Sequence, residues 1–173
     1  MNISVFGKLT FDDKKIIKHF VGFVLGRFVK PVLLERTKIT INLVEPSSLA
    51  GQDKKDLMEY GAWMERHSDY KYTITINSKL FKSKAKTFNG RLKDVLLCVG
   101  HELVHVKQYL NDEMVDWWNG QVKYKGLFYK DWEYGEGYWT APFELEAYSW
   151  ELALYEIFIE KSSKGRKIVS EAI

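Results

Sequence analysis

The sequence is poor in the residues that would build a covalent scaffold or a membrane anchor. Its 173 residues include only one cysteine, Cys98, and an intramolecular disulfide framework is therefore excluded. The longest apolar stretch, 20–34, is interrupted by Arg27, Lys30 and Pro31, so it is too broken to be a membrane-spanning helix. Only three prolines occur, while 46% of the residues are hydrophobic and 15% are aromatic. This composition indicates a folded globular chain rather than a disordered one.

The first ten residues do not have the pattern of a secretory signal. Polar residues are mixed with apolar ones there, and Asp12 and Asp13 follow directly. Together with the single cysteine, this pattern favours a reducing compartment. We therefore expect a cytoplasmic protein with no membrane partner.

Periodicity and capping signals predict a single α+β domain over residues 1–173. The apolar pattern and the spacing of Thr10 and Asp13 predict a helix over 11–29, which Pro31 ends. The further expected elements are a strand over 38–44, a weaker strand over 57–66, a hairpin turn at His67-Ser68-Asp69, a strand over 70–77, and helices over 90–110 and 142–161. The tail from about residue 162 is polar and rich in lysine.

Residues 101–105 have the sequence His-Glu-Leu-Val-His, which matches the pattern H-E-x-x-H. Histidines four apart project from one side of a helix, so His101 and His105 can reach one metal ion, with Glu102 on the adjoining edge. The opposite side carries an apolar stripe that would bury against the sheet, made of Leu92, Leu96, Val99, Leu103, Val106 and Leu110. We therefore expect a zinc site; the alternative is two surface histidines on an ordinary amphipathic helix.

A catalytic zinc site needs a third protein ligand besides these two histidines. The only other histidines, His19 and His67, both precede the motif, so a ligand from downstream has to be a carboxylate. The start of the last predicted helix offers Glu144 and Glu146, which point about 200° apart on a helix. We expect Glu144 to be the ligand and keep Glu146 as the alternative. The alternative without a metal is that Glu144 only interacts favourably with the helix dipole, as acidic residues in a first turn do.

The two motifs resemble those of the gluzincin branch of zinc metallopeptidases. The likeness rests on residues 101–105 and on Pro-Phe-Glu-Leu-Glu-Ala at 142–147. It is strongest to small single-domain metallopeptidases encoded by bacteriophages, and the chain is also similar to SprT-like and minimal gluzincin domains. The resemblance covers about residues 70–160. It implies a minimal zincin-like fold with an N-terminal helix, a small mixed sheet of three to four strands, an active-site helix and a C-terminal glutamate helix.

The same resemblance implies a peptidase that holds one zinc ion per chain. His101, His105 and Glu144 would bind the metal, and Glu102 would be the general base for a metal-activated water that attacks a peptide bond. Gluzincins often have an aspartate directly after Glu-x-x-Ala that braces a ligand histidine, whereas this chain has Tyr148 there. A bacteriophage origin would place the protein in an infected host cell or in the virion.

Tyrosines near the second motif are candidates for stabilising a developing oxyanion, because a phenol donates a hydrogen bond without changing its charge. The candidates are Tyr138, Tyr148 and Tyr134, in the order of their expected reach to the cleft. For each of them, a purely structural role in the core is the alternative. By the same resemblance, the strand over 70–77 would lie at the edge of the cleft and pair with an extended peptide substrate.

The connector 111–140 holds nine of the 26 aromatic residues of the chain. One interpretation is a lid or wall of a substrate cleft. The simpler one is a hairpin over about 121–130 that covers the helix pair.

Although the net charge is only +3, basic residues gather in one segment, 79–93, as Lys79, Lys82, Lys84, Lys86, Arg91 and Lys93. Such a run is typical of a solvated loop or of a nucleic-acid contact. Two functions therefore compete with the metallopeptidase. One is a non-catalytic, zinc-stabilised structural or binding protein such as a virion component. The other is a protease recruited to DNA by this segment.

Overall fold

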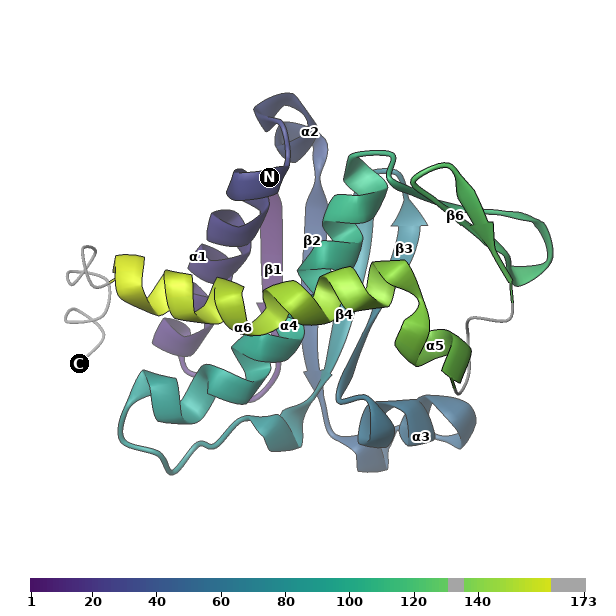
Figure 1. The fold of residues 1–173 in the computed structure, drawn as a ribbon. Coiled ribbons are helices and arrows are strands. Elements are labelled where there is room, and N and C mark those ends of the chain that lie inside the picture. Colours follow the sequence, from purple (N-terminus) through teal and green to yellow (C-terminus); the bar gives the residue numbers. More distant parts are fainter. Residues whose placement is uncertain (131–135, 163–173) are drawn as a thin grey trace.

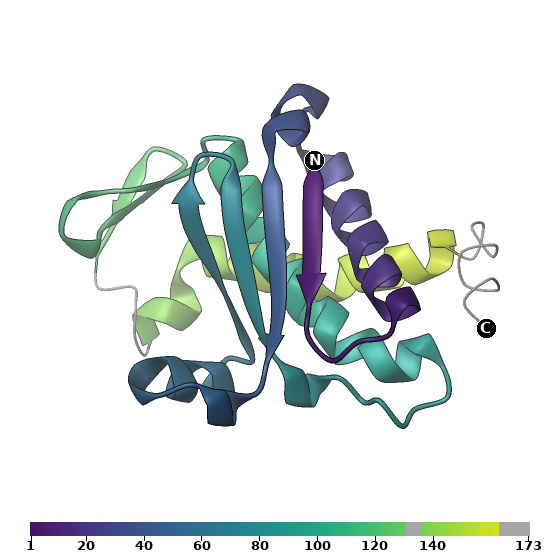
Figure 2. The same ribbon diagram turned by 180° about the vertical axis from the view of Figure 1, so that it is seen from behind.

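The computed structural model describes residues 1–130 and 136–162, which form a mixed α+β fold. Three long helices lie on one face of a four-stranded sheet (Figure 1). The view from behind shows the other face of the sheet, which these helices leave uncovered (Figure 2). In the part of the chain that is described, no helix is both long and apolar enough to cross a membrane.

The sheet consists of β1 (Asn2–Phe6), β2 (Lys38–Val44), β3 (Ala62–Ser68) and β4 (Lys71–Asn77). The strands lie in the order β1-β2-β4-β3. The first three in that order are parallel, and β3 pairs antiparallel with β4 at one edge. Alternate residues of β2 are buried, namely Ile39, Ile41 and Leu43. The predicted strand over 38–44 is confirmed at both ends.

Helix α1 (Phe11–Phe28) and the short helix α2 (Pro31–Arg36) connect β1 to β2. The predicted cap of α1 is confirmed, because the Thr10 hydroxyl oxygen accepts a hydrogen bond from the Asp13 amide at 3.1 Å. The Asp13 carboxylate is fully buried and pairs with the Arg91 guanidinium at 3.0 Å. This ion pair joins the start of α1 to the start of the next long helix.

Helix α4 (Phe88–Leu110) carries the H-E-x-x-H motif. The Thr87 hydroxyl oxygen caps it by accepting a hydrogen bond from the Gly90 amide at 3.1 Å. The predicted apolar stripe is confirmed, since Leu92, Leu96, Val99, Leu103, Val106 and Leu110 are all buried in the main core. That core also holds residues of α1 and the sheet, so the histidine side of α4 is left for contacts with other elements.

Helix α6 (Pro142–Ser162) lies across α4 (Figure 1). Before it come a three-stranded antiparallel sheet of β5 (Met114–Asp116), β6 (Val122–Tyr124) and β7 (Leu127–Tyr129), and then helix α5 (Glu136–Thr140). A second, smaller core forms here from Met114, Val122, Tyr124, Ala141 and Phe143. The predicted hairpin in the aromatic connector is thus confirmed as β6 and β7, although β5 was not predicted.

The region from 57 to 70 corrects the sequence-based expectation. Leu57 is not in a strand but in helix α3 (Gly51–Glu59), where it is the one buried residue of a polar helix. Gly61, with φ of 81°, ends this segment, and β3 begins only at Ala62. The strand then runs through Ser68, so the hairpin turn lies at 69–70 rather than at 67–69.

Strand β4 does not lie at an edge, which corrects the expected place of the strand over 70–77. It pairs with β2 on one side and with β3 on the other, so its backbone groups are used within the sheet. The edge strand beside α4 is β3. Three 3-10 helices complete the described elements, at Pro46–Ser48, Ser78–Leu80 and Trp118–Gly120.

Candidate metal centre

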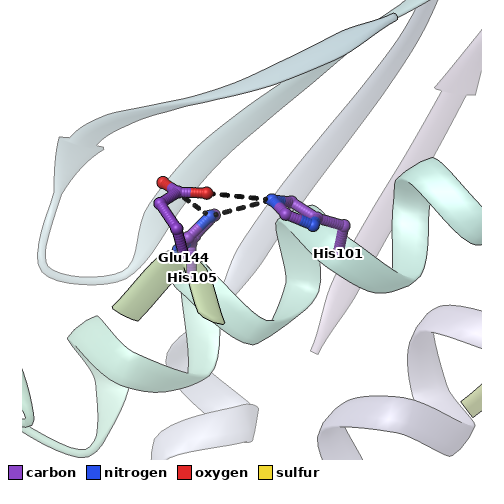
Figure 3. A group of neighbouring side chains, drawn as sticks. All are labelled: His101, His105 and Glu144. Carbon is purple, nitrogen blue, oxygen red and sulfur yellow. Dashed lines mark hydrogen bonds and ion pairs between the residues drawn. The ribbon is translucent and has the colours of Figure 1, made fainter. Parts of the chain in front are cut away.

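Helices α4 and α6 bring His101, His105 and Glu144 together (Figure 3). The two Nε2 atoms of the histidines are 3.3 Å apart. One Glu144 oxygen lies 3.3 Å from His101 Nε2, and the other lies 3.4 Å from His105 Nε2. The three residues are buried, with exposed fractions of 7%, 8% and 4%. The predicted ligand set is therefore assembled in space.

This spacing fits a tetrahedral metal ion. Zinc bonds to nitrogen and oxygen of about 2.0–2.1 Å would place the ligand atoms of a tetrahedron about 3.3–3.4 Å apart. The separation of the two Nε2 atoms equals that value, and each Nε2 has a Glu144 oxygen at 3.3 or 3.4 Å, a different oxygen for each histidine. The arrangement also concentrates acceptors, because a neutral imidazole and a carboxylate both offer lone pairs. Positive charge stabilises such a cluster, either as a proton on a histidine or as a metal ion that the three residues could hold.

The pKa values of Glu144 and His101 also show that positive charge is favoured in the cluster. Burial alone would raise the pKa of Glu144, but hydrogen bonds and charge from His101 and His105 outweigh it and lower the pKa to about 2. Burial would lower the pKa of His101, but the hydrogen bond to Glu144 and the nearby carboxylate of Glu151 raise it to about 10. Glu144 is therefore held as a carboxylate that faces two imidazoles.

Glu102 lies next to the cluster and lines the same cavity as the three candidate ligands. It is 7% exposed, and it is not one of the three residues whose ligand atoms lie close together. Burial raises the pKa of Glu102, an effect that His101 and His105 partly oppose. A carboxylate with a raised pKa beside a metal site has the property that a general base and acid needs.

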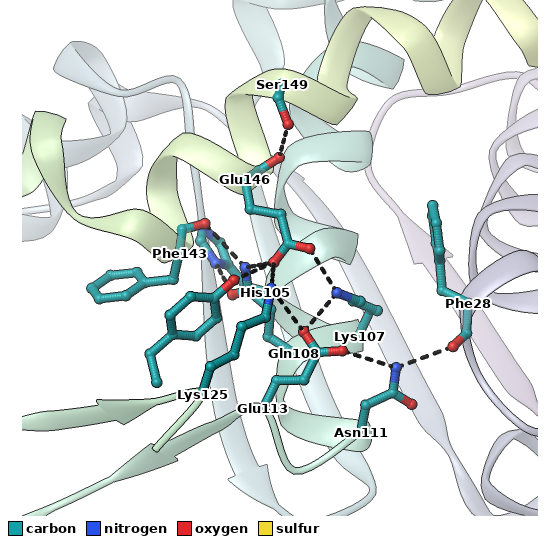
Figure 4. Close-up of polar contacts among 11 residues, drawn as sticks. Phe28, His105, Lys107, Gln108, Asn111, Glu113, Lys125, Phe143, Glu146 and Ser149 are labelled. Carbon is teal, nitrogen blue, oxygen red and sulfur yellow. Dashed lines mark hydrogen bonds and ion pairs between the residues drawn. The ribbon is translucent and has the colours of Figure 1, made fainter. Parts of the chain in front are cut away.

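Gln108 orients His105 from behind (Figure 4). The Gln108 side-chain nitrogen donates hydrogen bonds to the Phe143 carbonyl and to Glu146, each at 3.0 Å. Its oxygen is thereby directed at His105, where it accepts a hydrogen bond from Nδ1 at 3.0 Å. With the proton on Nδ1, His105 presents the lone pair of Nε2 to the cluster.

Glu146 belongs to a polar network that reaches Gln108 on the Nδ1 side of His105 (Figure 4). It accepts hydrogen bonds from Lys107 at 2.8 Å, from Gln108, and from the Tyr124 hydroxyl. Burial would raise the pKa of Glu146, but the hydrogen bond with Lys107 and the others lower it to about 2. Of the two candidate third ligands, the structure brings only Glu144 to the histidines.

Two of the three candidate tyrosines adjoin the cluster. Tyr138 lines the cavity and shares a hydrogen bond with Tyr148. The Tyr148 ring packs edge-on against His101, with 4.5 Å between ring centroids. Burial, the Glu144 charge and that hydrogen bond raise the pKa of Tyr138, so its phenol keeps its proton. The third candidate, Tyr134, lies outside the described residues.

A cavity of about 480 Å³ opens beside the cluster. One wall is the edge strand β3, which contributes Ala62, Trp63 and Met64. Tyr60 and two aspartates of α3 line another part. This volume lies in the range of small-molecule and peptide side-chain sites. Among the described residues, β3 pairs only with β4, so its outer edge lies next to the candidate metal ligands.

Two described side chains of the aromatic connector line this cavity. They are Met114 from β5 and Tyr138 from α5, whereas Trp117, Trp118 and Phe128 are exposed to solvent. The small sheet packs on Phe143 through Val122 and Tyr124. The hairpin of the connector therefore covers the start of α6, as the simpler interpretation predicted, while Tyr138 forms part of the cavity wall.

Two side chains of the basic segment form ion pairs within the described residues. Arg91 pairs with the buried Asp13, as described above, and the exposed Lys82 pairs with Asp94 at 2.7 Å. The Lys93 ammonium lies 5.7 Å from the centre of the Tyr155 ring. Lys79, Lys84 and Lys86 are exposed.

Cys98 lies one turn before His101 but is not among the converging ligands. Burial raises the pKa of its thiol to about 12, with Glu102 adding to the effect, so it is a neutral side chain at neutral pH.

No family model matches the chain, and searches of the curated proteins and of the solved structures found no significant match. The evidence on function is therefore the site itself. Sequence reasoning missed Gln108, Glu151 and Tyr60 near the cluster. Gln108 could have been predicted from the sequence, because a residue three positions after His105 lies on the same face of the helix. The other two become neighbours only through the crossing of α4 with α6 and through the packing of α3.

Proposed function

We propose that the chain is a zinc-dependent metallopeptidase with a minimal zincin-like fold of the gluzincin type. The observation that carries the proposal is the convergence of one ligand atom each from His101, His105 and Glu144 within 4.8 Å, with Glu102 beside them in a cavity. Zinc retention alone does not require Glu102, whereas hydrolysis requires a base at that place. The substrate is a protein or peptide.

Each residue of the site has a distinct role in this proposal. When bound, zinc would act as a Lewis acid on water and on the scissile carbonyl. Glu102 would take the proton of the attacking water and return it to the leaving amine. Tyr138, which faces the same cavity, would donate a hydrogen bond to the oxyanion. The edge of β3 would hold the substrate backbone by strand pairing, in place of the strand over 70–77.

The test is peptide cleavage by the zinc-loaded protein, with products identified by mass spectrometry from a mixture of unrelated peptides. Glu102→Gln removes the base and is expected to abolish cleavage while zinc content stays at one per chain. Glu156→Gln removes the same charge from an exposed position of α6 and is expected to cleave at the wild-type rate. Cleavage that survives in Glu102→Gln would contradict the proposal.

A structural zinc site is the second candidate, favoured by the way the ligands join two helices. His101 and His105 come from α4 and Glu144 from α6, with the long connector between them. A metal here would link the helices irrespective of catalysis. Stabilisation by zinc together with no cleavage of any peptide would favour this candidate over the enzyme.

Recruitment to DNA receives less support, because Arg91 and Lys82 have partners within the fold. We therefore propose no nucleic-acid partner. The proposal places the enzyme in the cytoplasm, since a single cysteine offers no intramolecular disulfide that an oxidising compartment would form.

A further inference from the structure

The Nδ1 atom of His101 is the least satisfied polar atom of the candidate metal centre. The His101 side chain is 9% exposed, and Nδ1 is buried with no hydrogen-bond partner among the described residues. A buried donor without an acceptor costs about 1–3 kcal/mol. The same position on His105 is filled by the oxygen of Gln108. His101 therefore needs an acceptor on its outer side.

The carboxylate of Glu151 is placed to be that acceptor. It lies on α6, with one oxygen 3.6 Å from His101 Nδ1, just beyond hydrogen-bonding distance. Glu151 follows Glu144 by seven residues, which is almost two helical turns, so both side chains leave the same face of α6. The first reaches the inner side of the His101 ring and the second its outer side.

Glu151 also has room to close the remaining distance. Its side chain is 30% exposed. A cavity of about 50 Å³ is lined by Glu151, His101, Tyr148 and Cys98. A rotation of a partly exposed glutamate is a small change, and it would bring the oxygen within about 3 Å of Nδ1. The Tyr148 ring also packs against the imidazole of His101, with an interplanar angle of 63°.

We propose that Glu151 is the positioning residue of His101, holding its ring with the proton on Nδ1 and the lone pair of Nε2 toward the metal. This inference rests on the metal-binding part of the proposed function and not on its chemistry. It gives the two histidines different supports, a carboxylate for His101 and a neutral amide for His105. A carboxylate behind a ligand histidine fixes the ring and raises its basicity, which strengthens metal binding. Glu151 thus takes the bracing place that Tyr148 cannot fill.

The test compares zinc affinity in three variants by competition with a chelating dye. Glu151→Leu removes both the charge and the acceptor and is expected to weaken zinc binding about 10- to 100-fold. Glu151→Gln keeps an acceptor oxygen and is expected to lie between Leu and wild type. Glu156→Gln, an exposed position on the same helix, is expected to bind as the wild type does.

Nitrogen-15 NMR of the zinc-loaded protein observes the Nδ1 proton of His101. Its signal depends on the hydrogen bond to Glu151, and a general loss of stability would not change it in the same way. We expect a slowly exchanging Nδ1 proton on His101 in the wild type, an upfield shift of that proton in Glu151→Gln and fast exchange in Glu151→Leu. Because the Gln variant preserves shape, it keeps the test valid if the Leu variant fails to fold. Wild-type zinc affinity and an unchanged Nδ1 signal in Glu151→Gln and in any folded Glu151→Leu would overturn the role of Glu151. A wild type that binds no zinc would instead overturn the proposed function, and this inference with it.

Discussion

Gln108 binds His105 through the ring nitrogen that points away from the ligand cluster. The hydrogen bond from Nδ1 to the Gln108 oxygen is 3.0 Å long, and the amide cannot flip without losing its bonds to Phe143 and Glu146. The tautomer of His105 is thus set by a residue one turn along the same helix. The candidate metal centre therefore includes contacts between α4 and α6 behind the three candidate ligands.

We predict that Gln108→Leu weakens zinc binding about 10- to 100-fold, because His105 loses the acceptor that orients its ring. Dye competition measures the effect. Gln52→Leu, an exposed substitution on α3, is the matched control and should leave the affinity unchanged. Equal affinities for Gln108→Leu and wild type would contradict this role of Gln108.

We predict that Lys107 stabilises the fold through its ion pairs with the carboxylates of Glu113 and Glu146. Its side chain is 11% exposed and lies 2.7 Å from Glu113 and 2.8 Å from Glu146. Lys107→Met leaves both acids without their ammonium group and should lower the free energy of unfolding by about 1–3 kcal/mol in urea denaturation. The exposed pair of Lys82 and Asp94 provides the comparison, since Lys82→Met should cost less than about 1 kcal/mol. Equal losses for the two variants would refute the prediction.

The buried pair of Asp13 and Arg91 supports a second stability prediction. Asp13 is fully buried, so Arg91→Met would leave a buried carboxylate without its counter-ion. We expect a loss of about 3–5 kcal/mol in the free energy of unfolding. The double variant Asp13→Asn with Arg91→Met should recover part of this loss in the same denaturation experiment. A single variant as stable as the wild type would contradict the interpretation.

Most long elements were predictable because local patterns determine them. The stripe from Leu92 to Leu110 and the Thr10 cap placed two helices to within two residues, and alternation in 38–44 placed β2. Strand β1 and helix α2 have five and six residues, too few for a periodic signal. In α3, Leu57 is the one buried residue, so the sequence carries no apolar stripe from which to predict a helix.

The candidate metal ligands were predictable, but their supports were not. His101 and His105 lie on one predicted helix, and the second motif offered Glu144 and Glu146 at the start of another. Helical geometry showed that only one of these two could face the histidines, and the resemblance to gluzincins favoured Glu144. Glu151 and the edge position of β3 depend on how α6 crosses α4 and on strand order, and no local pattern encodes either.

We predict that Tyr138→Phe lowers kcat of peptide cleavage about 10²- to 10³-fold while zinc content stays unchanged, because the phenol donates to the oxyanion and not to the metal. Tyr129→Phe, in the small core, is the control and should have little effect on kcat. A Tyr138→Phe enzyme with the wild-type kcat would assign that role to another group.

Removing zinc is predicted to destabilise the chain, since the ligands join α4 to α6. Free zinc at about 100 times its dissociation constant should add about 2.7 kcal/mol to the free energy of unfolding. The measurement is the urea midpoint with excess zinc and with a chelator. His19→Ala changes an exposed histidine of α1 and should keep the full zinc effect, whereas His105→Ala should lose it. A midpoint that zinc does not move would contradict binding at this cluster.

The most direct test of the metal centre is elemental analysis of the purified protein and of three variants. We predict one zinc per chain in the wild type and in Glu146→Ala, with the metal lost or greatly weakened in His105→Ala and Glu144→Ala. A wild type that takes up no metal when zinc is supplied would contradict metal binding by His101, His105 and Glu144.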